Sequence, residues 1–229
     1  MPPVVRITEI DCFRGIAIIL MIIFHIVFDL AYFYNWPIEY LHGFWYYQGK
    51  SSAILFMLVS GVSTTFSRSP IRRGLSVFGA GMLITIVTYL YNPSMYIQFG
   101  ILHLLGFGML ISPWVTRLPA WLLILTGTLL VITSSWTDRL TTSTAWLLPL
   151  GITPSGFASL DYYPLLPWLG IMLYGMAAGK LMYAAKEPLW PSATANLPFR
   201  ALSRLGRHSL LIYLIHQPIL LTIFALIFP

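Results

Sequence analysis

The chain has 229 residues, of which 58% are hydrophobic and only 9% are charged, and its mean hydropathy is +0.79. A soluble domain needs far more charge, so this composition indicates an integral membrane protein. The formal net charge of +6 does not indicate a nucleic-acid partner, because the basic residues lie in short segments between apolar stretches. The single cysteine, Cys12, excludes an intramolecular disulfide and a multi-cysteine metal site.

Apolar stretches along the chain predict transmembrane helices, since about 20 residues rising about 1.5 Å each cross the hydrocarbon layer. Seven spans are predicted, at approximately residues 13–33, 52–66, 74–91, 99–115, 119–135, 162–182 and 208–228. The second and fifth are short, so tilted or re-entrant segments and a total of six or eight spans stay open. No repeat and no polar block of domain size interrupts the chain. Residues 1–229 are therefore predicted to form one all-α polytopic membrane bundle.

The distribution of Lys and Arg predicts the orientation. With seven spans and a cytoplasmic N-terminus, only Lys50 and Arg139 fall outside, and the other basic residues fall inside. The C-terminus is then outside, and a multi-pass protein of the plasma membrane, with the lipid bilayer as partner, is expected. The inner residues are Arg6, Arg14, Arg68, Arg72, Arg73, Arg117, Lys180, Lys186, Arg200, Arg204 and Arg207.

Ionisable side chains inside the first predicted span indicate a site of chemistry, because such groups rarely persist at membrane depth without a function. His25 and Asp29 are four residues apart and therefore share one helix face. We expect His25 to act as a general base and Asp29 to orient its ring. The alternative is a structural hydrogen-bonding pair. His216 and Gln217, near the middle of the last span, are expected to face the same interior.

Several polar and aromatic residues are predicted on the outer side, where they are expected to line a vestibule for an acceptor. They are His42, Trp45, His103, Asp161 and Tyr162. Each has a structural alternative: His42, Trp45 and Tyr162 suit an aromatic belt at the membrane interface, and His103 suits helix packing. Asp161 is alternatively a cap for the sixth span.

Basic residues on the inner side predict a cationic mouth for a polyanionic cytosolic donor, since guanidinium groups bind phosphate oxygens bidentately. The alternatives are a topology signal, lipid-headgroup contacts and, for Arg14, an ion pair with Asp11. Cys12 is an alternative acyl carrier, or simply a packed residue. The residues of the predicted mouth are Arg14, Arg72, Arg73, Arg204, Arg207 and His208.

Five short motifs stand in order along nearly the whole chain, with His25 between the first two. They are Asp11-Cys12-Phe13-Arg14-Gly15, Phe56-Met57-Leu58-Val59-Ser60-Gly61, Phe99-Gly100-Ile101-Leu102-His103, Tyr163-Pro164-Leu165-Leu166-Pro167-Trp168 and Leu205-Gly206-Arg207-His208-Ser209. Their order and spacing resemble the heparan-α-glucosaminide N-acetyltransferase-like family of membrane acyltransferases. The compact bacterial branch is the more similar one.

This resemblance implies transfer of an acetyl group from cytosolic acetyl-CoA, a co-substrate rather than a permanently bound cofactor, to an amino sugar across the membrane. It also implies an active-site role for His42, whereas in the animal enzymes an asparagine stands at the place of His25. The acceptor, described as a glycan or glycolipid, the choice of N- or O-acetylation and a homodimeric state stay open. A proton-coupled transporter using the His25 and Asp29 pair, or a non-catalytic regulatory membrane protein, is the alternative.

Overall fold

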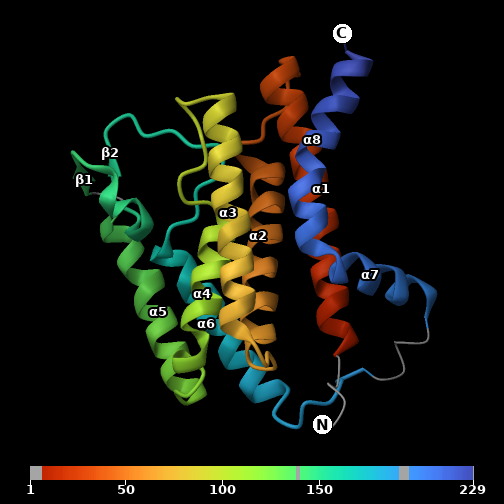
Figure 1. Ribbon diagram of the computed structural model, residues 1–229, viewed down its shortest axis with the longest axis vertical. Helices are drawn as coiled ribbons and strands as arrows, with labels where there is room; N and C mark the ends of the chain where they lie inside the picture. The colour runs from red at the N-terminus through yellow and green to blue at the C-terminus, as the bar shows by residue number, and fades with distance from the viewer. Residues whose placement is uncertain (1–6, 138–139, 191–195, 229) are drawn as a thin grey trace. The chain divides into compact units, whose positions relative to one another are not determined.

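The computed structural model describes residues 7–137, 140–190 and 196–228. Arg6 and Arg139, which entered the predicted charge asymmetry, lie outside these described residues. Helices form most of the described chain, and two short strands pair in parallel (Figure 1). The elements are α1 (Thr8–Tyr34), α2 (Gly43–Thr64), α3 (Pro70–Tyr91), α4 (Ile101–Val115), α5 (Ala120–Thr137), β1 (Thr141–Thr142), the 3-10 helix η1 (Ala145–Leu150), β2 (Thr153–Pro154), α6 (Leu165–Met182), α7 (Leu197–Arg207) and α8 (Ser209–Ile227).

Each of the seven predicted spans contains a helix, and the all-α membrane architecture is confirmed. Among the described residues, five helices, α1, α3, α5, α6 and α8, are long and apolar enough to cross a membrane. The fifth span, predicted to be short, is among them as α5. The short apolar helix is instead α4, with 15 residues. Helix α2 begins at Gly43 rather than near residue 52, because an aromatic turn and a polar turn precede the apolar run in the same helix. The total of seven spans stays a prediction.

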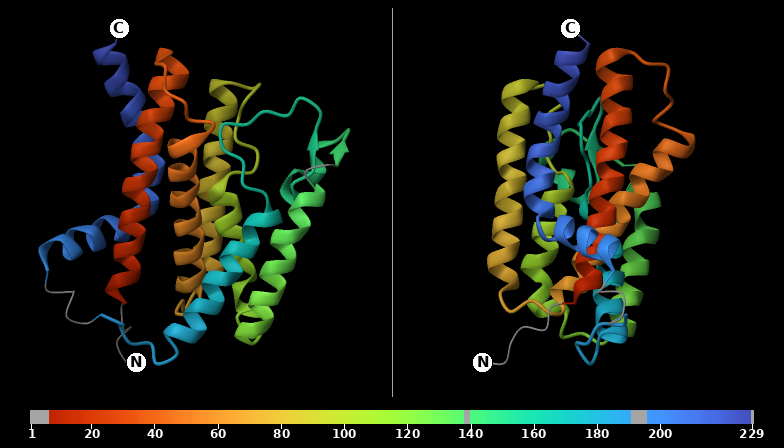
Figure 2. Two further views of the ribbon diagram at one scale, coloured as in Figure 1. Left: turned by 180° about the vertical axis from the view of Figure 1, so that it is seen from behind. Right: turned by 90° about the vertical axis from the view of Figure 1, so that its right-hand side faces the viewer.

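The chain divides into two compact units, and their boundary falls within α2. The first unit comprises Met1–Phe56 and Lys186–Pro229, and the second comprises Met57–Ala185. In the first unit, α1 packs against α7 and α8. Helix α8 runs along α1, whereas α7 crosses its direction (Figures 1 and 2). Helix α7 lies where the sequence predicted only a basic connection, and it begins beside Pro198, since proline is tolerated in a first helical turn. The prediction of a single domain over residues 1–229 stays a prediction.

Glycines allow α1 and α7 to approach each other closely. A Cβ atom on Gly15 would collide with the carbonyl of Leu202, and one on Gly206 would collide with the carbonyl of Asp11. Small residues at helix contacts are typical of membrane proteins, where backbone proximity replaces the hydrophobic driving force. Two of the five sequence motifs, one from each end of the chain, therefore meet at this crossing.

The second unit consists mainly of two packed helix pairs, α3 with α4 and α5 with α6. Gly106 of α4 lies against Phe78 of α3, and a Cβ there would overlap the Phe78 backbone. Gly127 of α5 and Gly170 of α6 face each other in the same way, each next to the other's carbonyl oxygen. Close glycine contacts of this kind fix the pairing of neighbouring membrane helices.

Helix α4 tolerates an internal proline because a side chain replaces the lost hydrogen bond. Pro113 has no N–H, so the carbonyl oxygen of Met109 loses its helical partner. The hydroxyl of Ser112 donates to that oxygen over 2.8 Å, and Ser112 is only 1% exposed. Unpaired backbone groups are costly in a membrane, so Ser112 removes a penalty that Pro113 creates.

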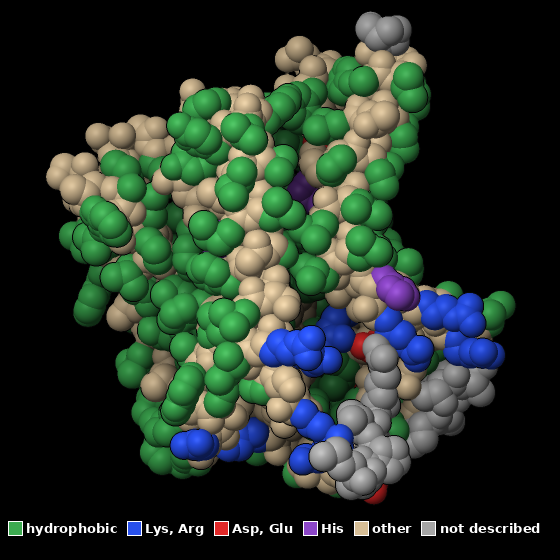
Figure 3. Space-filling view, in the orientation of Figure 1, with side chains coloured by type: hydrophobic (Ala, Val, Ile, Leu, Met, Phe, Trp, Pro, Cys, Tyr) green, Lys and Arg blue, Asp and Glu red, His purple; other side chains and the backbone are tan. Residues whose placement is uncertain are grey.

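Basic side chains gather at one end of each unit taken by itself. In the second unit, Lys180 at the end of α6 donates to the carbonyl oxygens of Thr116 and Leu118, over 2.9 and 2.5 Å, in the turn between α4 and α5. In the first unit, basic side chains lie over α7, which carries Arg200, Arg204 and Arg207 (Figure 3). Basic residues that set the orientation of a membrane protein produce such a one-sided distribution.

Candidate functional site

Two histidines face each other where α1 packs against α8. The ring centroids of His25 and His216 lie 4.7 Å apart, and the rings are inclined by 75°. Nδ1 of His25 lies 2.9 Å from the carbonyl oxygen of Met21, and Nδ1 of His216 lies 2.6 Å from that of Tyr213. A carbonyl oxygen only accepts, so both Nδ1 atoms carry the hydrogen in the neutral rings. Each Nε2 is therefore left with a free lone pair.

The same helix pair holds a buried carboxylate. Asp29 is 0% exposed, and its Oδ1 accepts a hydrogen bond from Nε2 of Gln217 over 2.5 Å. The sequence predicted that Asp29 pairs with His25 on the same helix. The hydrogen bond that the carboxylate makes goes instead to Gln217 on α8. Three buried atoms of these two helices have no hydrogen-bond partner within the part of the chain that the structure describes: Oδ2 of Asp29, Oε1 of Gln217 and Nε2 of His216. The ionised carboxylate, the amide oxygen and the neutral ring nitrogen all need donors.

A shortage of donors at buried acceptors has a physical meaning. Each such atom costs about 1–3 kcal/mol when it stays unpaired, so a ligand or a proton that supplies donors is bound favourably there. A metal is not indicated, since the described residues contain no group of three or more His, Cys, Asp or Glu that could hold one. We call His25, Asp29, His216 and Gln217 the acceptor cluster, where the word refers to hydrogen-bond acceptors and not to the molecule that accepts the acetyl group.

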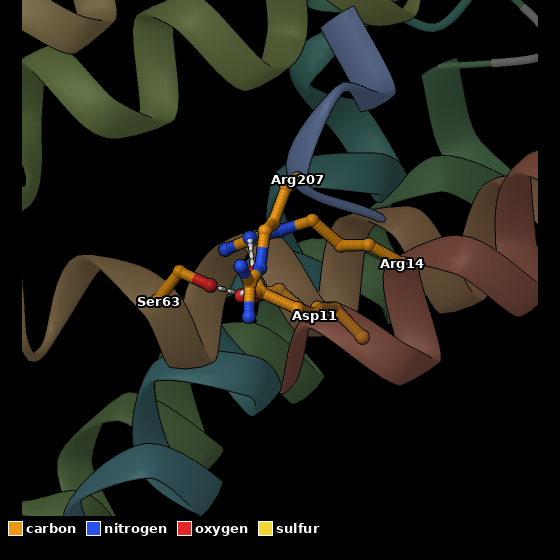
Figure 4. A network of polar contacts seen from close by, with 5 residues as sticks. Asp11, Arg14, Ser63 and Arg207 are labelled. Carbon is orange, nitrogen blue, oxygen red and sulfur yellow. Dashed lines mark hydrogen bonds and ion pairs between the residues drawn. The ribbon is translucent and has the colours of Figure 1, made fainter. Parts of the chain in front are cut away.

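A cationic group lies at the crossing of α1 and α7. The carboxylate of Asp11, 4% exposed, is 2.7 Å from Nη1 of Arg14 and 3.8 Å from Nε of Arg207 (Figure 4). The structure thus brings together two arginines of the predicted mouth at one carboxylate. Arg204 and His208 are exposed nearby in sequence, on α7 and at its end.

The other two arginines of the predicted mouth belong to the second unit. Arg72 and Arg73 are exposed in the first turn of α3, which begins at Pro70. A positive charge at a helix N-terminus opposes the helix dipole, so these residues do not serve the stability of α3. Their position suits a topology signal or a phosphate contact.

His103 and Asp161, both predicted on the acceptor side, hold the N-terminus of α4. Nδ1 of His103 accepts from the backbone N–H of Gly100, and its Nε2 lies 3.2 Å from the hydroxyl of Thr85. Oδ2 of Asp161 accepts from the backbone N–H of Ile101 over 2.9 Å. Asp161 therefore caps α4 rather than the sixth predicted span, whose helix α6 has no side-chain cap at its start. Both nitrogens of His103 are in use.

The remaining predicted acceptor-side residues lie apart from the acceptor cluster in the chain. His42 is in the connection before α2, with 83% of its side chain exposed and its Nδ1 3.5 Å from Oε1 of Glu39. Trp45 is on the first turn of α2 and contacts Phe44 edge-on. The hydroxyl of Tyr162 donates to the carbonyl oxygen of Leu148 in η1. The roles of these three residues at an acceptor site stay predictions.

A buried carboxylate at the start of α1 was not predicted from the sequence. Glu9 in the first turn of α1 is 0% exposed, and its carboxylate accepts from the backbone N–H groups of Leu189 and Trp190, over 2.6 and 3.5 Å. Trp190 also packs its ring on Phe13. A glutamate ahead of a long apolar run was the available signal, but its partners stand 180 and 181 positions later in the chain.

These features define a class of helical membrane protein. A His and Asp cluster that lacks hydrogen-bond donors lies where α1 packs against α8, and arginines gather near the start of α1. The family model described as "Heparan-alpha-glucosaminide N-acetyltransferase, catalytic" matches residues 6–218. The chain belongs to this family, which confirms the resemblance seen in the sequence and assigns it to membrane acetyltransferases. No curated protein and no solved structure matched the chain.

Proposed function

We propose that the protein transfers the acetyl group of acetyl-CoA to an amine or hydroxyl of an amino sugar or other glycan, with His25 as the general base. The observation that carries this proposal is the state of the His25 ring. Its Nδ1 hydrogen is held by the Met21 carbonyl, so Nε2 is the basic atom. As the acceptor attacks the acetyl carbon, Nε2 takes its proton and the C–S bond breaks.

Asp29 supports this reaction through charge rather than through a direct bond to the ring. It stands one helical turn from His25 on α1, and a carboxylate at that distance stabilises the imidazolium that forms. Gln217 holds the carboxylate in place by its hydrogen bond to Oδ1. Transfer is direct, without an acyl-enzyme, and Cys12, which is buried, serves packing.

The cationic groups are proposed to bind the phosphates of CoA. Arg14 and Arg207 are already fixed by Asp11, so little conformational entropy is lost when a phosphate joins them. Arg204 and His208 add exposed positive or polar groups next to them in the chain. Arg72 and Arg73 are proposed to contribute from the start of α3.

Sidedness follows from the charge distribution. The basic end of each unit is proposed to face the cytoplasm, with the N-terminus inside and the C-terminus outside the plasma membrane. Acetyl-CoA then enters from the cytoplasm. The acceptor enters from the opposite side, where His42, Trp45 and Tyr162 are proposed to contact it, while His103 and Asp161 support the end of α4.

The test uses the full chain in sealed vesicles of known orientation, with labelled acetyl-CoA on one side and a panel of amino sugars and glycolipids on the other. Labelled acceptor should form only when acetyl-CoA is on the face that carries α7. Transfer from either face would contradict the sidedness. If acetyl-CoA binds but no acceptor is acetylated, proton-coupled transport becomes the better explanation of the unpartnered Asp29 Oδ2.

A further inference from the structure

We infer that His25 and His216 form a two-histidine proton site, in which one proton is shared between the two rings, and that His216 is a functional partner of His25. The role of this proton site in a reaction rests on the proposed acetyl transfer. The proton site itself is a property of the α1 and α8 pair and can be measured without any substrate.

The geometry points to a single proton for the two rings, held by one ring or the other, because Nε2 of His216 has no hydrogen-bond partner among the described residues. Both Nδ1 hydrogens are held by backbone carbonyls of the ring's own helix, Met21 for His25 and Tyr213 for His216. Each ring can therefore gain a proton only at Nε2. With 4.7 Å between the ring centroids, two imidazolium charges would repel strongly in apolar surroundings, so the pair holds one proton rather than two.

The polar groups around the two rings favour the protonated state of the pair. In the first unit, the titratable groups at the pair are Asp29 on α1 and Tyr213 on α8, the latter with its ring centroid 5.6 Å from that of His216. Asp29 has a buried oxygen without a donor, and so has Gln217 beside His216. A proton on the pair turns an acceptor nitrogen into a donor and balances the carboxylate charge. The excess of acceptors that the acceptor cluster shows when both rings are neutral is thereby reduced.

In the reaction, the pair would store the proton between two events. The acceptor N–H or O–H bond breaks as its N–C or O–C bond to the acetyl carbon forms, and Nε2 of His25 takes the proton. The proton is shared with His216 while the C–S electrons leave with sulfur. The CoA thiolate then takes this proton from the pair, so that amine or alcohol plus thioester gives amide or ester plus thiol.

The experiment follows the ring nitrogens by NMR across a pH series. The chain has five histidines, so ¹⁵N-histidine labelling of the full-length protein in detergent gives few ring signals, assigned by His25→Asn and His216→Asn. If one proton is shared, both rings should change together, each reaching about half the amplitude of a singly titrating ring. In His216→Asn, the His25 signal should then reach the full amplitude.

Two outcomes would overturn the inference: full, independent steps for the two rings in the unaltered protein, or a His25 curve that His216→Asn leaves unchanged. His216→Gln is the second variant if His216→Asn does not fold. Thr222→Val, at an exposed position on the same helix, is the matched control and should leave both curves as they are. Since no substrate is added, a failure of acetyl transfer cannot be mistaken for a failure of the proton site.

Discussion

Two regions of the molecule place a histidine and an aspartate in apolar surroundings, and they differ in how these side chains are satisfied. At the start of α4, both nitrogens of His103 have partners and Asp161 accepts from the backbone of Ile101. In the acceptor cluster, Asp29 and His216 each keep a buried atom without a partner. Residue types that look equivalent in the sequence therefore have different capacities for chemistry.

The difference separates architecture from function. A fully hydrogen-bonded network rigidifies its surroundings and has nothing left to offer a ligand. A network with unpaired buried acceptors is strained until a donor arrives, and such exceptions in a folded protein need an explanation. We therefore expect substitutions at α4 to change stability and substitutions in the acceptor cluster to change turnover.

The largest effect is expected for His25→Ala. Loss of the general base should lower the turnover of acetyl transfer by about 100-fold or more, while the affinity for CoA is kept. Turnover and CoA binding would be measured on the same purified preparation, with Thr222→Val as the control on α8. Normal turnover in His25→Ala would remove this residue from the mechanism and make His42 the next candidate.

His103→Ala should act on the fold. It leaves the N–H of Gly100 without a partner and should lower the free energy of unfolding by about 1–3 kcal/mol. Thermal unfolding in detergent measures this, and Asp161→Asn, which keeps most of the side chain, is the milder companion. If either variant instead raises the acceptor KM at unchanged stability, the vestibule predicted from the sequence is correct and the comparison with the acceptor cluster fails.

Charge reversal at α7 should weaken CoA by about tenfold, as expected for one lost charge-assisted contact. Arg204→Glu should change CoA affinity alone. Arg207→Glu should also reduce stability, because it removes a partner of the buried Asp11 carboxylate. Competition binding with CoA and dephospho-CoA measures the effect. An equal loss for both ligands would assign the contact to the diphosphate rather than the 3′-phosphate, and no loss would remove α7 from the donor site.

The smallest effect is expected for Ser112→Ala, at about 1 kcal/mol of unfolding free energy. The substitution leaves the Met109 carbonyl unpaired only because Pro113 has no N–H. In a Pro113→Ala background the backbone N–H returns, and Ser112→Ala should then cost clearly less. Equal costs in the two backgrounds would show that the hydroxyl serves something other than this carbonyl.

The helices could be predicted from the sequence because apolar runs of span length leave few alternatives, as the agreement over α3 and α6 shows. The pairing of polar groups could not, because it depends on residues far apart in the chain. Thr85 stands 18 positions before His103, and Gln217 stands 188 positions after Asp29. Spacing within one helix suggested that Asp29 serves His25, whereas packing gave it a partner on α8.

The crossing of Gly15 and Gly206 bears on how the protein is made. The second unit is one continuous stretch of chain, whereas the first unit is formed by two segments separated by all of the second. During synthesis, the second unit has its whole sequence available before residues 197–207 emerge from the ribosome. The face of α1 that packs against α7 has no partner until then, so it stays unpacked while the whole second unit is made.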